Sequence, residues 1–142
     1  MQIGVEVSRA VENKRIFVVE DDEIIRSALH FMLHDENETH ELASLEQAYG
    51  KGEVWKPDLI LLGMSVAKAG GAGVLGEIAA RWPGAKILLV ADSAGDPVAQ
   101  QFLKSGADGM LTKPITIESV RFKVDVTLGR RKLPMIPLAM LA

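Results

Sequence analysis

The chain has 142 residues, a formal net charge of −3 and no cysteine. That length is typical of one domain, and a hydrophobic fraction of 48% is too high for a disordered chain. The absence of cysteine excludes disulfides and thiolate metal sites, and a pI of about 5.6 argues against nucleic-acid binding by this domain. No apolar run reaches the roughly 18–20 residues of a membrane span, and the N-terminus lacks the apolar core of a secretory signal. We therefore expect a cytoplasmic protein without a membrane partner.

Short apolar segments alternate along the chain with segments of helical periodicity. The segments expected to form strands are 15–20, 38–43, 59–62, 86–91 and 108–112. The segments expected to form helices are 23–33, 45 to 50 or 52, 74–81, 97–104 and 117–128, with N-caps at Asp22, Ser44, Asp96 and Thr116. Residues 64–73 are rich in glycine and show little periodicity, so we expect a loop there.

This alternation predicts the topology of the sheet. Strands that alternate with helices form βαβ units, and their right-handed crossovers give an α/β fold with a doubly wound parallel sheet. Five strands in a chain of this size indicate a flavodoxin-like fold of three layers (α/β/α), with strand order 2-1-3-4-5 and a switch point between strands one and three. Residues that follow those two strands should therefore face one crevice.

Three carboxylates, Glu20, Asp21 and Asp22, follow the first strand directly. Acidic oxygens at the carboxyl end of a parallel sheet are hard ligands of the kind that Mg²⁺ prefers. The alternative is that Asp22 only caps the next helix and that the other two carboxylates are solvated. The acidic run alone leaves both interpretations open.

Three motifs occur together at consistent spacing: VVEDD at 18–22, PDLILL at 57–62 and GADGMLTKP at 106–114. With them the chain resembles the receiver domain of two-component response regulators over residues 15–128, which leaves 1–14 as a lead-in and 129–142 as a tail or linker. The resemblance implies phosphoryl transfer from a histidine kinase to an aspartate, with Mg²⁺ held by the acidic residues. It also implies that a hydroxyl after strand four and a lysine after strand five bind the phosphate.

Part of the family's site is present in this sequence. Glu20 and Asp21 match the acidic pair, and Lys113, followed by Pro114, matches the lysine. The family often has a cis peptide before that proline, which an X–Pro bond tolerates. These residues form what we expect to be a vestigial acidic pocket.

Two decisive positions depart from the family. The resemblance places Gly63 at the phosphoacceptor position and Ala91 at the hydroxyl position, so neither a nucleophile nor a hydroxyl donor is present there. Further departures are Ala67 at the position of a proline and Met110 at that of an aromatic switch residue. Asp92 follows Ala91, where the family prefers a small neutral residue.

Ser65, Asp92 and Pro114 are expected at the mouth of the pocket. Ser65 is expected to offer its backbone carbonyl rather than to replace the acceptor. Lys113, without an acceptor aspartate, is expected to be semi-buried and to pair with Glu20, Asp21 or Asp92, because a lone buried ammonium is costly.

The sequence thus predicts a receiver-like signalling module that is not phosphorylated, is not an enzyme, has no cofactor and binds Mg²⁺ at most weakly. It would act by contact with a partner protein. The alternative is a module that binds a small molecule or anion in the emptied crevice near Lys113. Whether an output domain follows residue 142 stays open.

The last predicted helix carries a second apolar pair, Phe122 and Val126, opposite the stripe that packs on the sheet. The receiver family commonly dimerises through the fourth helix, fifth strand and fifth helix, so the resemblance implies a homodimer on this face. The alternative is that the apolar tail 133–142 covers the pair in a monomer.

Overall fold

The computed structural model describes residues 13–131 and contains eleven helices and strands within them. The strands are β1 (Arg15–Val19), β2 (Glu38–Leu42), β3 (Leu59–Gly63), β4 (Lys86–Ala91) and β5 (Gly109–Thr112). The helices are α2 (Glu23–Leu33), α3 (Leu45–Gly52), α4 (Met64–Gly70), α5 (Val74–Arg81), α6 (Pro97–Lys104) and α7 (Ile117–Thr127). The lead-in before residue 13 and the tail from 132 lie outside the described residues, so the predicted domain boundaries stay predictions. None of the helices described is long and apolar enough to cross a membrane.

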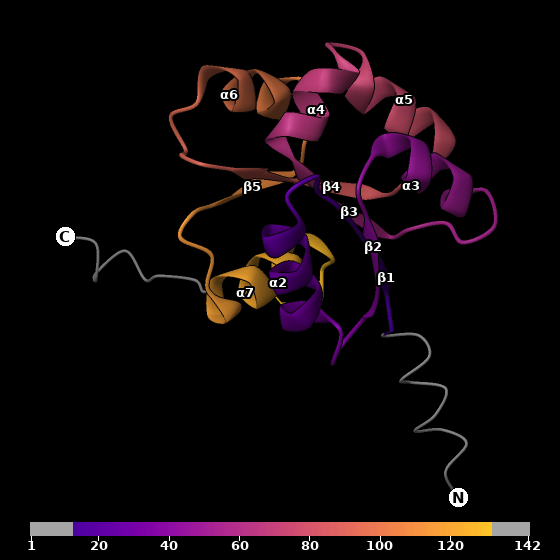
Figure 1. The fold of residues 1–142 in the computed structure, drawn as a ribbon, viewed down its shortest axis with the longest axis vertical. Coiled ribbons are helices and arrows are strands. Elements are labelled where there is room, and N and C mark those ends of the chain that lie inside the picture. Colours follow the sequence, from indigo (N-terminus) through magenta and orange to yellow (C-terminus); the bar gives the residue numbers. More distant parts are fainter. Residues whose placement is uncertain (1–12, 132–142) are drawn as a thin grey trace, which may run out of the picture.

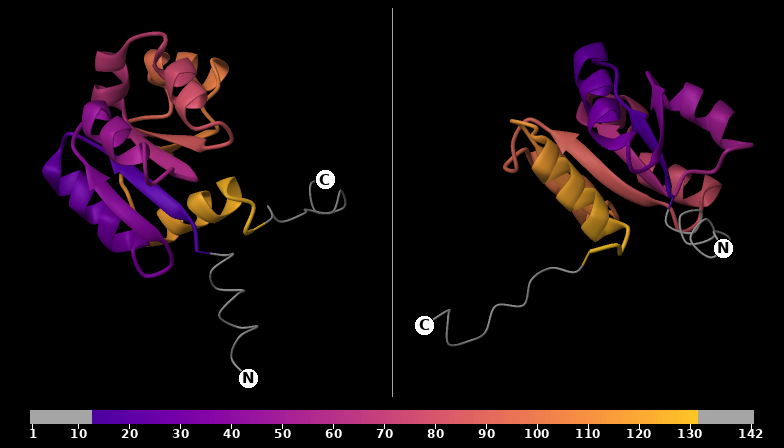
Figure 2. Two further views of the ribbon diagram at one scale, coloured as in Figure 1. Left: turned by 90° about the vertical axis from the view of Figure 1, so that its right-hand side faces the viewer. Right: turned by 90° about the horizontal axis from the view of Figure 1, so that it is seen from below.

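The five strands form one parallel sheet in the order β2-β1-β3-β4-β5, which confirms the predicted topology. Helices α2 and α7 cover one face of the sheet, and α3, α4, α5 and α6 cover the other (Figures 1 and 2). In the register of β1 with β3, Val19 lies opposite Leu62, and β4 sets Val90 opposite Gly63. The chain therefore leaves β1 and β3 at the same edge of the sheet.

The strands are apolar on both faces because helices cover both. Alternate residues of β1 and β3, such as Phe17 and Ile60, pack under α3 and α5, whereas Ile16 and Leu61 pack against α2 and α7. All four of these side chains are fully buried. The two cores meet only through the sheet, so the strands hold both helix layers in place.

The predicted N-caps are confirmed. Asp22 Oδ1 accepts hydrogen bonds from the N–H groups of Ile24 and Ile25, at 2.9 and 3.1 Å, at the start of α2. The side chains of the residues predicted to cap α3, α6 and α7 accept in the same way. Because a cap fixes where a helix begins, each helix starts at a set distance from the end of the strand before it.

The expected loop at residues 64–73 is wrong, because residues 64–70 form α4. Met64, Val66 and Ala67 are buried against the sheet, and this burial stabilises a helix that would be too short to be stable alone. The glycines end the helix instead of preventing it: Gly70 is its last residue, and Gly71 has φ +82°, in the left-handed region.

Trp82 joins α3 to the end of α5. Its indole Nε1 donates a hydrogen bond of 3.1 Å to the carbonyl oxygen of Gly52, and its ring meets Phe17 edge-on at 5.8 Å. Only 4% of Trp82 is exposed. The indole lies so close to Gly52 that a Cβ atom added there would overlap the ring.

We expect Gly52→Ala to lower the free energy of unfolding by roughly 1–3 kcal/mol, because the methyl group would push Trp82 out of its position. The matched control is Gly50→Ala in the same helix, where an added Cβ meets no atom within 4 Å. Alanine there should raise stability by up to about 1 kcal/mol through helix propensity. Urea unfolding of the three proteins checks both changes, and equal stability of Gly52→Ala and the wild type would contradict the packing described.

Candidate functional site: an acidic crevice at the carboxyl edge of the sheet

A crevice of about 240 Å³ lies where β1, β3, β4 and β5 end. Its lining contains five of the residues predicted from the sequence, Glu20, Asp21, Ser65, Asp92 and Lys113. The other residues that line it are Asp22, Met64, Lys68, Val90 and Asp96. The topology therefore brings together residues that lie up to 93 positions apart in the sequence.

Glu20 lies directly over the position that the resemblance assigns to the acceptor. Only 7% of this residue is exposed, and its carboxylate accepts a hydrogen bond of 3.1 Å from the backbone N–H of Asp22. A Cβ atom added at Gly63 would lie 2.6 Å from Glu20 Oε1. The Glu20 carboxylate thus occupies the space that a side chain at position 63 would need.

Burial raises the pKa of Glu20 above the ordinary glutamate value of 4.5. The hydrogen bond from the Asp22 N–H opposes this rise, and the neighbouring Asp21 carboxylate adds to it because two negative charges repel. The Arg26 guanidinium donates to the Glu20 backbone oxygen at 2.8 Å, so it holds the main chain here.

Lys113 pairs with Asp92, one of the three partners that the sequence leaves open. Its Nζ lies 2.9 Å from Asp92 Oδ1, and this hydrogen bond is the main reason that the pKa of Lys113 is raised. The expectation of a semi-buried lysine is wrong: the side chains of Lys113 and Asp92 are 40% and 86% exposed. The Lys113–Pro114 peptide bond is cis, as the resemblance implies. An ion pair this exposed contributes little to stability.

Lys68 is the residue of the crevice that sequence reasoning missed. It lies on α4, the helix that the sequence did not predict, and its Nζ is 3.6 Å from Asp96 Oδ2. A buried stripe of Met64, Val66 and Ala67 is the signal that could have placed it, because that stripe orients α4 and directs Lys68 outward.

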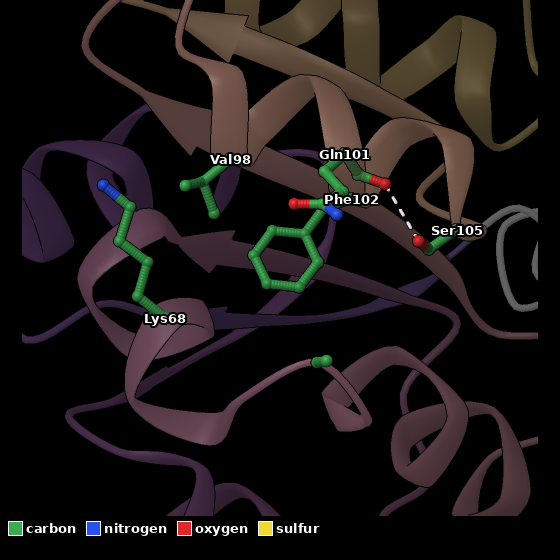
Figure 3. A pocket seen from close by; sticks show the side chains of 6 residues that line it. Lys68, Val98, Gln101, Phe102 and Ser105 are labelled. Atoms are coloured by element: carbon green, nitrogen blue, oxygen red, sulfur yellow. Dashed lines mark hydrogen bonds between the residues drawn. The ribbon is translucent and has the colours of Figure 1, made fainter.

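A second hollow, also of about 240 Å³, lies between α4 and α6 (Figure 3). Phe102 and Val98 form its apolar wall, and Ser105 Oγ donates to the Gln101 carbonyl at its far end. Lys68 lines this hollow as well as the crevice, so it separates the two. The hollow adds no further charged side chain to the site.

The charge of the crevice disfavours an anionic ligand. Its lining holds five carboxylates, from Glu20, Asp21, Asp22, Asp92 and Asp96, and two ammonium groups, so the formal balance is −3. Both lysines already lie beside a carboxylate. An anion that approached Lys113 would meet more repulsion than attraction.

The residues present fit a magnesium ion poorly. The Asp22 carboxylate caps α2, that of Asp92 faces Lys113, and that of Glu20 lies over Gly63. Within residues 13–131 no group of three or more histidine or acidic side chains is arranged to hold a metal ion. Mg²⁺ needs nearly octahedral oxygen ligation, and with Glu20 and Asp21 as the side chains left for it, water would have to supply most of its ligands.

The residues of the predicted interface lie elsewhere. Phe122 and Val126 of α7 line a separate hollow of about 360 Å³. Asp108, the residue directly before β5, lines the same hollow. Both apolar side chains are half-buried rather than open, and the Arg131 guanidinium lies 5.4 Å from the centre of the Phe122 ring. Whether residues 132–142 cover this pair lies outside the described residues.

We expect Glu20→Gln to be more stable than the wild type at neutral pH. The folded-state pKa of Glu20 lies above its unfolded-state value, so its stabilising contribution is full below the unfolded-state pKa and is lost as the pH rises through the folded-state pKa. Glutamine does not ionise, so the variant does not lose this stability as the pH rises. The difference in free energy of unfolding between the variant and the wild type should therefore vanish below about pH 4. Urea unfolding across this pH range measures it, with the exposed Glu46→Gln as control. A variant less stable than the wild type at neutral pH would show that burial is not the dominant effect.

Comparison with known proteins assigns the family. The family model for the response regulator receiver domain matches residues 16–125. The PhoP regulatory protein of alkaline phosphatase synthesis from Bacillus subtilis is 33% identical over 124 residues, which are 85% of this chain and 51% of that protein. The chemotaxis protein CheY of Halobacterium salinarum is 29% identical over 110 residues, 75% of this chain and 90% of that protein. The transcriptional regulatory protein PdtaR of Mycobacterium tuberculosis is matched over 58% of its length, so the chain spans about half of several relatives.

Solved structures give the same fold. The chemotaxis protein CheY4 of Vibrio cholerae superposes with a TM-score of 0.72 at 21% identity, over 81% of this chain and 98% of that one. The receiver domain of the sensor histidine kinase PA1611 of Pseudomonas aeruginosa is described with a magnesium ion in its active site cleft. It superposes with a TM-score of 0.71 at 22% identity, over 82% of this chain and 98% of that one. With a family model that covers residues 16–125, this chain belongs to the receiver domain family of two-component response regulators.

Proposed function

We propose that this receiver domain acts in two-component signalling as a protein-interaction module that is not itself phosphorylated. The observation that carries the proposal is the pair Glu20 and Gly63: the position that the resemblance assigns to the acceptor has no side chain, and a neighbouring carboxylate fills the space. A covalent phosphoryl intermediate needs a nucleophile at the reacting position, and glycine has none.

Two neighbours support the same proposal. Ala91, at the position of the hydroxyl, is 1% exposed, and its side chain has no group that donates a hydrogen bond. Ser65 is exposed at the mouth of the crevice, but a serine hydroxyl is a weak nucleophile without an adjacent base. In this proposal the domain has no enzymatic activity and binds Mg²⁺ weakly at best. A cytoplasmic location stays a prediction from the sequence.

We also propose that the domain forms a homodimer through the face of α6, β5 and α7. Phe122 and Val126 present apolar surface there, next to Lys123 and Asp108, whose opposite charges suit a self-complementary contact. Partner proteins of the signalling pathway would compete for this face or bind beside it.

We expect no adduct of about 80 Da, the mass of one phosphoryl group, after incubation of the wild type with acetyl phosphate and Mg²⁺. Intact-mass spectrometry measures it. The matched variant is Gly63→Asp combined with Ala91→Thr, which supplies both missing groups and forces Glu20 to turn away. This variant should gain the adduct.

An adduct on the wild type would overturn the proposal, and its loss in Ser65→Ala would identify the acceptor. Calorimetric titration of the same two proteins tests the metal. Micromolar affinity of the wild type for Mg²⁺ would contradict weak binding, whereas tighter binding by the double variant is expected because it adds a carboxylate beside Glu20.

Sedimentation equilibrium tests the dimer. We expect the wild type to dimerise at tens of micromolar protein without acetyl phosphate, and Phe122→Asp to be monomeric, because a charge in an apolar contact must be desolvated. The exposed Phe31→Asp on α2 is the matched control and should leave the dimer intact. A monomeric wild type, or a dimeric Phe122→Asp, would show that this face is not the interface.

A further inference from the structure

Two histidines lie on one face at the C-terminal end of α2. His30 and His34 are four residues apart, and their rings are nearly parallel, 10° apart with centroids separated by 5.4 Å. The His34 backbone N–H donates to the His30 carbonyl at 2.9 Å, so the helical spacing holds up to the cap residue. Their side chains are 34% and 45% exposed, which leaves both rings open to an ion from solvent.

Both Nδ1 atoms face oxygen atoms, and that of His34 makes a hydrogen bond. His34 Nδ1 lies 3.0 Å from the Phe31 carbonyl oxygen, to which only an Nδ1–H can donate. His30 Nδ1 lies 3.6 Å from Glu41 Oε2 on β2. The hydrogen bond to Phe31 orients the His34 ring in the way that a second hydrogen bond orients a metal-binding histidine, and it leaves Nε2 as the nitrogen that can exchange a proton for a metal ion.

The surroundings suit a cation. Asp35 Oδ1 lies 3.3 Å from His34 Nε2, and the C-terminal end of a helix carries a partial negative charge. Two arginines lie nearby: Arg26 Nε is 3.6 Å from Glu41, and Arg121 is 3.6 Å from Asp35. Each guanidinium lies beside one of the two carboxylates that face the histidine pair.

We propose that His30 and His34 form a binding site for a divalent transition-metal ion, Zn²⁺ or Cu²⁺. Two imidazoles at i and i+4 on a helix share one face and can hold one such ion. Water completes the coordination, because no third side chain among the described residues is arranged around the pair. This site is chemically distinct from the crevice, since imidazole nitrogen selects transition metals whereas carboxylate oxygen suits Mg²⁺. An ion that binds there also stabilises the fold, because it joins successive turns of α2.

The test titrates the full chain with Zn²⁺ and, separately, with Cu²⁺ by calorimetry. We expect one equivalent of each ion to bind, and Cu²⁺ to bind more tightly than Zn²⁺. His30→Ala and His34→Ala should each weaken binding on the order of 100-fold, because the second ligand of a chelate binds at a high effective concentration. Far-UV circular dichroism confirms that the variants are folded.

Three controls make the result specific. His40→Gln removes a histidine outside the pair, and Glu20→Gln alters the crevice; both should keep wild-type affinity. His34→Ala combined with Asp35→His keeps the number of histidines but spaces the pair five residues apart, so binding should be lost. The proposal is overturned if the wild type shows no saturable binding, if this respaced variant binds as tightly as the wild type, or if Glu20→Gln abolishes binding. None of these outcomes depends on whether the domain is phosphorylated.

Discussion

The pairing of β1 with β3 is the constraint on which the site depends. The register that sets Val19 opposite Leu62 brings the residues that follow, Glu20 and Gly63, to the same point at the edge of the sheet. The four residues of each strand that pair with the other, 16–19 and 59–62, are fully buried between two layers of helices. A shift of the β1–β3 register by one residue would move the side chains of one core into the other. The packing of apolar side chains therefore fixes where Glu20 and Gly63 lie, and charged side chains are not needed for it. The positions of Glu20 and Gly63 are therefore set by strands whose paired side chains are all apolar.

Within this geometry, Glu20 and Gly63 are best understood together. A carboxylate with 7% exposure is costly unless it has hydrogen-bond donors and room, and here the Asp22 N–H supplies the donor while Gly63 leaves the room. The ammonium group that could have neutralised it, that of Lys113, instead lies beside Asp92 at the rim. The carboxylate whose pKa is raised by burial thus lies in the space that a side chain at position 63 would need, so this glycine bears on the electrostatics of the site as well as on its nucleophile.

The parts of the structure that could be predicted from the sequence are those fixed by local chemistry. The order of the strands follows from the alternation of apolar and amphipathic segments, and the cap at Asp22 follows from its position before the helix. Helix α4 was missed because its burial against the sheet is a property of the folded chain, although the apolar stripe of Met64, Val66 and Ala67 that it buries is present in the sequence. For the same reason the sequence left three partners open for Lys113: its direction is set by the rim of the folded sheet. The spacing of His30 and His34 is visible in the sequence, but the orientation of their Nδ1 atoms is not.

The proposed function also constrains how such a domain can signal. A ligand shifts a conformational equilibrium only as far as it binds the two states differently. A phosphoryl group brings a charge of about −2 into a receiver's crevice, whereas an exposed pair such as Lys113 and Asp92 is a far weaker bias. Without the phosphoryl group, packing alone determines the conformation of the face formed by α6, β5 and α7. In this proposal, that face does not switch between two conformations. The fraction of the domain bound to a partner then depends on the concentrations of the two proteins. In this proposal, signalling is regulated by the amount of partner present and not by phosphorylation of this domain.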